Sequence, residues 1–178
     1  MMSKPSDQAT PFPLRSNSAW SMDGIRRFLD ATRIPLRMAL ESSRNPLIVS
    51  LWFELRDDAI WCVAHRDALA VKLIGQDPAC AMDISTNEIP YRGVRGAGTV
   101  CCLPDAGAET LDRLIQRYLG SDANRLARWL KSRQDEEVAL KITPNWLTSW
   151  DFSSRMSDID NAPTVATGPA ATGRTAAE

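Results

Sequence analysis

The stretch that decides the fold of this chain is residues 47–64, whose sequence is LIVSLWFELRDDAIWCVA. Residues 47–55 are rich in Ile, Val, Trp and Phe, which favour strands, so we expect a central strand there. Residues 56–59, Arg-Asp-Asp-Ala, are typical of a tight turn, and residues 60–64 then return as the partner strand. The sequence therefore predicts a β-hairpin at the centre of the fold.

Further elements are expected on both sides of this hairpin. A short helix begins after Ser21, a good N-cap, and Gly120 is a good C-cap between two later helices. The apolar patterns predict further helices at 67–76, 108–119 and 122–132, and strands at 34–42, 80–84, 91–100, 138–142 and 146–150. Because most neighbouring strands are joined by hairpins or short links, we predict a mainly β antiparallel barrel with peripheral helices.

The composition suits one globular domain. The chain has 178 residues, with 21 basic and 22 acidic side chains and a formal net charge of −1. This balance excludes a basic nucleic-acid-binding domain, and the longest apolar run, residues 46–53, is far shorter than the ~20 residues of a membrane span. We expect a cytoplasmic domain over residues 21–156, a disordered N-terminal tail over 1–20 and a disordered C-terminal tail over 157–178.

Several kinds of catalytic or metal site are disfavoured by the residues present. The four cysteines form no Cys-x-x-Cys pair, so reduced thiols are expected rather than disulfides or a zinc site. His65 is the only histidine, which excludes a histidine-rich metal centre. The glycines at 93, 96 and 98 have the wrong order for a dinucleotide-binding loop and indicate a bulge or a close approach within a strand. The sequence assigns no catalytic residue.

Five segments, taken in order, carry a family resemblance. They are PLIVSLWF at 46–53, DDAIW at 57–61, ALAVKLIGQDP at 68–78, PYRGVRGAG at 90–98, and ITP at 142–144 followed by TSWDF at 148–152. Together they resemble the pyridoxamine 5′-phosphate oxidase-like group of FMN-binding split-barrel proteins, over about residues 24–156. The resemblance implies an antiparallel six-stranded split β-barrel, a homodimer, and FMN, or the deazaflavin F420 or haem, bound between the subunits.

The resemblance also implies where the cofactor lies: along the strand at 47–52, at the end of the next strand and near the following helix. A phosphate group needs two or more cationic partners, which adds basic residues further along the chain. The expected cofactor-binding residues are Ile48, Val49, Ser50, Leu51, Trp52, Ala64, His65, Arg66, Lys72, Arg92, Arg95 and Trp150. Trp146 and Tyr91 are further candidates for stacking on the ring or closing the groove from the partner subunit.

Alternation divides the strand at 47–53 into two faces. Leu47, Val49, Leu51 and Phe53 point one way, towards the expected core, whereas Ile48, Ser50 and Trp52 point the other way and could line the cofactor groove. For Trp52, packing under a helix or in a dimer interface is an equally good interpretation.

The sequence departs from the family pattern at two places. Many members have a lysine near the start of the helix after the third strand, but Leu69 and Ala70 stand there, so Lys72 or Arg66 would have to take its place. The C-terminal Arg and His that grip the substrate phosphate in true pyridoxamine 5′-phosphate oxidases are also missing, so vitamin B6 synthesis is not predicted. We expect an FMN-dependent oxidoreductase acting on a small molecule. An F420-dependent reductase, or a non-enzymatic split barrel with flavin, haem or no cofactor, is the alternative.

Overall fold

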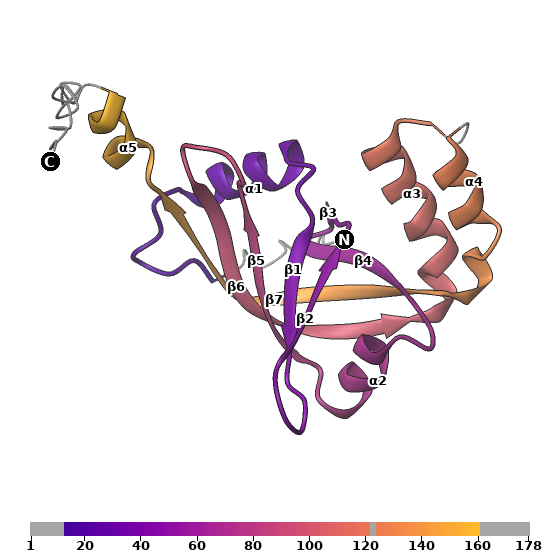
Figure 1. Cartoon of the computed structure of the whole chain (residues 1–178). Coiled ribbons are helices and arrows are strands. Elements are labelled where there is room, and N and C mark those ends of the chain that lie inside the picture. Colours follow the sequence, from indigo (N-terminus) through magenta and orange to yellow (C-terminus); the bar gives the residue numbers. More distant parts are fainter. Residues whose placement is uncertain (1–12, 122–123, 161–178) are drawn as a thin grey trace, which may run out of the picture.

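The structure, a computed structural model, describes residues 13–121 and 124–160, without the side chains of residues 158–160. Seven strands form one curled antiparallel sheet, and helices lie around it (Figure 1). The strands are β1 (Leu36–Leu40), β2 (Leu47–Leu51), β3 (Glu54–Arg56), β4 (Ala59–His65), β5 (Ala79–Ser85), β6 (Arg92–Leu103) and β7 (Glu137–Asp151). The helices are α1 (Met22–Ala31), α2 (Leu69–Gln76), α3 (Gly107–Leu119), α4 (Arg125–Lys131) and α5 (Ser153–Asp160), with short 3-10 turns η1 (Pro104–Ala106) and η2 (Gln134–Glu136). The predicted mainly β antiparallel fold with peripheral helices is confirmed.

The order of the strands explains why the sheet curls. The order is β2-β1-β5-β6-β7-β4-β3, so β2 and β3 are its two edges. These edges are joined in the chain by only Trp52 and Phe53. Two residues span less than ~8 Å, so the sheet must bend until its edges meet. The predicted single strand at 47–55 is therefore wrong in one respect: it breaks at Trp52, where the chain leaves one edge of the sheet for the other.

Side-chain alternation divides the inside of the barrel from the outside as predicted for β2. Leu47, Val49 and Leu51 pack against the core, Phe53 is fully buried in it, and Ile48 is 68% exposed. In the β3–β4 hairpin, the tight turn at 57–58 is also confirmed, since Asp57 and Asp58 both have positive φ.

The two longest strands are β6 and β7, and the whole of β6 pairs with residues 139–151 of β7 in the middle of the sheet. The two strands predicted at 138–142 and 146–150 are a single strand, β7, because the pairing continues across Pro144 through a bulge at Ala97/Gly98. The close approach expected at the glycines is present: a Cβ on Gly96 would lie 2.4 Å from the carbonyl oxygen of Trp146.

The helices lie at separate places around the sheet, with α3 and α4 side by side (Figure 1). α1 is capped by Ser21, whose Oγ accepts from the Gly24 N–H at 3.3 Å, and buries Ile25 and Leu29. α3 and α4 cover the outer side of β4, and Gly120 ends α3 in the left-handed conformation, as predicted. No helix in the described part of the chain is long and apolar enough to cross a membrane.

The described structure continues past residues 21 and 156, the expected ends of the folded domain. Residues 13–20, assigned to the N-terminal tail, run beside β7: the Arg15 N–H donates to the Leu147 carbonyl, and the Ala19 N–H donates to the Ser149 carbonyl. At the other end α5 continues to Asp160, past the expected boundary at 156. The remaining tail predictions, for 1–12 and 161–178, lie outside the described residues.

Candidate functional site

A cavity of about 280 Å³ lies between the end of β2, the outer face of β4 and the helices α3 and α4; we call it the α3–α4 pocket. Its lining is mostly apolar. The lining residues are Ser50, Leu51, Trp52, Val63, Leu111, Leu126, Leu130 and Glu137. Pockets for small organic ligands usually have this character, with apolar walls and a few polar groups. Three of the residues predicted from sequence, at 50–52, therefore meet in one cavity.

Trp52 forms one wall of this pocket and also attaches the helices to the barrel. Its indole stacks on the Tyr118 ring, with ring centroids 4.9 Å apart and planes at 7°. It packs with Leu111 and Ile115 of α3, so the interpretation of Trp52 as packing under a helix is correct. The Tyr118 hydroxyl accepts from the Phe53 N–H at 3.2 Å, and burial raises the Tyr118 pKa. This stack fixes the orientation of the indole beside the cavity.

The other predicted residues of β2 contribute less to the pocket. Val49 points into the barrel and packs against the core, so its side chain is not available to a ligand on the outer face. Ile48 is on the outer face but does not line the pocket. Ala64, at the end of β4, also packs against the core.

At the end of β4, the two predicted polar residues already have partners. The Nε2 of His65 lies 3.1 Å from Glu136 Oε2, and its Nδ1 accepts from the Asp67 N–H at 3.1 Å. The Arg66 guanidinium donates to the carbonyl oxygen of Asp135. Both ring nitrogens of His65 are therefore engaged within the protein, and two carboxylates lie beside the ring.

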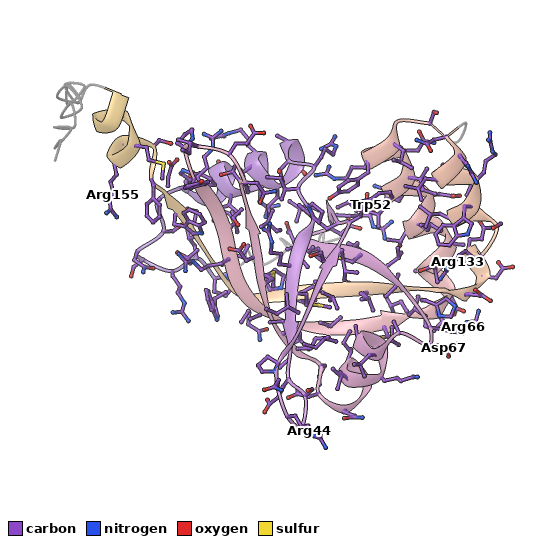
Figure 2. All side chains as sticks on the ribbon, viewed as in Figure 1. Arg44, Trp52, Arg66, Asp67, Arg133 and Arg155 are labelled. Carbon is purple, nitrogen blue, oxygen red and sulfur yellow. The ribbon has the colours of Figure 1, made fainter. Side chains whose placement is uncertain are left out.

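Arg133 and Glu137 form a further charged pair near the end of β4. Glu137 is 8% exposed, and its Oε1 lies 3.4 Å from Arg133 Nε. Figure 2 shows Arg66 and Asp67 close together below Arg133, near the end of the sheet. Lys72 projects from α2, is exposed, and has no ion pair or side-chain hydrogen bond with any residue that the structure describes. Lys72 is therefore the freest of the predicted cations near this end of β4.

Arg92, Arg95 and Trp150 lie at the other end of the sheet. His65 pairs with the first residue of β7 and Arg92 pairs with the last. These positions are 14 residues apart, which corresponds to roughly 45 Å along the strand. Arg95 lies over the Trp150 ring at 5.7 Å, on the outer face. Tyr91 is at this same end, whereas Trp146 stacks with Arg15 further along β7. Within one chain the predicted basic residues therefore do not form one phosphate site.

The sequence analysis missed the residues that α3, α4 and the start of β7 add to the pocket, namely Leu111, Leu126, Leu130 and Glu137, as well as Val63 of β4. The apolar stripe of α3 also predicts a buried face, and Leu111, Leu114 and Ile115 are indeed buried. Leu126 becomes a candidate only in the structure, because its 43% exposed fraction cannot be read from the sequence.

Comparison with known proteins places the fold but not the activity. No protein-family model matches the sequence, and no curated protein matches it. Among solved structures, the conserved hypothetical protein Rv2991 from Mycobacterium tuberculosis is similar with a TM-score of 0.67 and 18% identity, over 89% of this chain and 99% of that one.

Two further solved structures have a similar fold. An F420 reductase matches with a TM-score of 0.58 and 18% identity, over 68% of this chain and 94% of its own. A putative pyridoxamine 5′-phosphate oxidase from Listeria innocua matches with a TM-score of 0.54 and 11% identity, over 74% of this chain and 97% of that one. The chain thus has the split-barrel fold of the pyridoxamine 5′-phosphate oxidase-like flavin-binding proteins, as the resemblance implied.

The residues present fit the ring system of a flavin nucleotide better than its phosphate group. The apolar walls of the α3–α4 pocket, with the fixed indole of Trp52, fit a planar ring. The phosphate end is less complete, because His65 and Arg66 are engaged and only Lys72 is free near this end of β4 among the described residues.

Proposed function

We propose that this protein is an oxidoreductase that uses FMN, or alternatively F420, bound in the groove beside β2 and β4. The observation that carries the proposal is the α3–α4 pocket, which lies at the strand to which the family resemblance assigns the cofactor. The related folds of an F420 reductase and a putative pyridoxamine 5′-phosphate oxidase support a redox activity of this class. The substrate is a small molecule.

In this proposal the protein holds and shields the cofactor, which when bound supplies hydride-transfer chemistry. Leu51, Trp52 and Leu126 cover the ring and exclude water from it. Ser50 offers a hydroxyl at the rim of the pocket, and Lys72 neutralises the phosphate from α2. We assign no general acid or base, because the one histidine is held by Glu136 and Asp67.

We further propose that the active form is a homodimer. Ala39, Ala81 and Ala97 pair in register across β1, β5 and β6 on the outer face of the sheet, where their small side chains allow close approach of another surface. A second copy is also the simplest way to bring Arg95 and Trp150 to the pocket, since within one chain they lie at the far end of β7. Light scattering on the purified protein measures the oligomeric state directly, and a monomer at all concentrations would contradict this part of the proposal.

The test of the cofactor assignment is the visible absorption spectrum of the purified protein, followed by denaturation and identification of the released compound. Flavin bands with FMN in the supernatant support the first assignment, and F420 fluorescence supports the alternative. We expect Lys72→Ala to weaken cofactor binding about tenfold, since it removes one charge-assisted contact. The matched control is Lys141→Ala, whose ammonium lies over the Trp61 ring at 5.5 Å and which does not line the α3–α4 pocket.

A second candidate function is favoured by the engaged state of His65 and Arg66. A split barrel without a nucleotide cofactor would keep the fold and the apolar pocket but would need no free cations at the end of β4. A colourless protein that stays colourless when titrated with FMN, F420 and haem would support this candidate and contradict the redox proposal.

A further inference from the structure

A second cavity, of about 360 Å³, lies between α1 and the paired ends of β6 and β7; we call it the α1 pocket. It is distinct from the α3–α4 pocket and shares no lining residue with it. α1 contributes Gly24, Arg27 and Phe28, which recur at i, i+3 and i+4 and so lie on one face of the helix. Trp20, Ala31, Arg92 and Asp151 complete the lining.

The aromatic wall of this pocket is rigidly held. The Trp20 backbone N–H donates to Ser149 Oγ at 2.7 Å, and its carbonyl accepts from Ser18 Oγ at 2.9 Å. The indole Nε1–H donates to Asp151 Oδ2 at 3.1 Å. The Phe28 ring lies 5.1 Å from the indole at an angle of 47°. A flat ligand would therefore meet a preformed aromatic surface, which lowers the entropy lost on binding.

The charges around the pocket leave an excess of positive charge. Arg27 and Arg92 both line it, and neither guanidinium makes a hydrogen bond or an ion pair with a residue in the described ranges 13–121 and 124–160. The Asp151 carboxylate, in contrast, accepts from Trp20 Nε1 and, at 2.9 and 2.5 Å, from the N–H and Oγ of Ser153. The carboxylate thus has its own hydrogen-bond donors. It attracts Arg92 electrostatically but makes no ion pair with either arginine, so one positive charge is left without a counter-charge in the pocket lining.

We propose that the α1 pocket binds a planar aromatic anion of the carboxylate or phosphate type. The ring lies against Trp20 and Phe28, and the anionic group is bound by Arg27 and Arg92. Guanidinium groups bind carboxylate and phosphate oxygens with paired hydrogen bonds, and the net positive charge disfavours a cationic ligand. The volume holds a molecule of one or two fused rings. This site does not depend on a cofactor in the α3–α4 pocket.

The experiment titrates the full-length protein with 2-naphthoate and, as the uncharged match, 2-naphthamide. Affinity is measured by calorimetry, and the binding position by NMR of the six tryptophan indole N–H signals, with Trp20 assigned through Trp20→Phe. We expect 2-naphthoate to shift the Trp20 signal and to bind at least tenfold more tightly than 2-naphthamide.

Variants then test the two arginines separately. Arg27→Gln and Arg92→Gln should each weaken 2-naphthoate binding about tenfold. Arg44→Gln, at the far turn between β1 and β2 (Figure 2), makes the same change in net charge and should leave binding unchanged. Equal affinities for acid and amide, arginine variants that bind as Arg44→Gln does, or a shift at Trp52 in place of Trp20 would each overturn the proposal.

Discussion

Replacing Trp52 by alanine is expected to loosen the α3–α4 pair from the barrel without unfolding the strands. A fully enclosed tryptophan buries about 150–250 Å². Trp52 is partly enclosed, so truncation exposes roughly 100 Å² of apolar surface, which corresponds to about 2.5 kcal/mol. Loss of the parallel stack on Tyr118 adds about 1 kcal/mol. We therefore expect the free energy of unfolding to fall by about 3–4 kcal/mol.

The assay is urea unfolding followed by far-UV circular dichroism. Trp129→Ala is the matched control, because Trp129 is a tryptophan of α4 itself but is 54% exposed, so its loss should cost less than about 1 kcal/mol. A double-mutant cycle of Trp52→Ala with Tyr118→Ala isolates the stack, whose coupling should be about 1 kcal/mol. Equal destabilisation by the Trp52 and Trp129 variants, or zero coupling to Tyr118, would refute the reasoning.

Three further predictions concern packing, thiol chemistry and pH. Gly107→Ala should destabilise the fold by at least about 2 kcal/mol in the same urea assay, because its Cβ would lie 1.9 Å from the Glu137 carbonyl oxygen; a neutral effect would contradict this packing. A thiol reagent at pH 8 should label exposed Cys101 rapidly in the folded protein but spare Cys62 and Cys80, since burial raises their pKa, for Cys80 to about 11; mass spectrometry locates the label. Burial alone would raise the Asp151 pKa, but hydrogen bonds from Ser153 and Trp20 lower it overall, so Asp151 stabilises the fold above its unfolded pKa and ceases to do so as pH falls through its lower folded value. The stability advantage over Asp151→Asn should be constant near neutrality and shrink below about pH 4, as pH-dependent urea midpoints would show.

The sequence alone was sufficient to predict most of the local structure, such as strand faces, helix ends and turns. Alternating side chains identified the inner face of β2, Ser21 and Gly120 marked a helix start and a helix end, and the two aspartates marked the β3–β4 turn. These signals are local, since caps, turns and strand periodicity depend on residues within a few positions of one another. The ordered set of such segments was also enough to predict the split-barrel fold.

The interactions that build the candidate site depend on residues distant in sequence. Trp52 meets Tyr118, and His65 meets Glu136, because the barrel brings together segments separated by more than sixty residues. No periodicity encodes such a contact. The basic residues expected at one phosphate site illustrate the same limit. Arg66 follows His65, which pairs with the first residue of β7, whereas Arg92 pairs with the last, so the two cations lie at opposite ends of that strand.

Closure of the barrel separates most clearly what the sequence determines from what the tertiary structure decides. The sequence determined that residues 47–55 are extended and apolar, which a short window of strand-forming side chains is enough to establish. Only the tertiary structure decided that the chain changes hydrogen-bonding partner at Trp52, from β1 to β4. That choice is made by the whole sheet, because its two edge strands are joined by only two residues, so the sheet must curl until these edges lie close together.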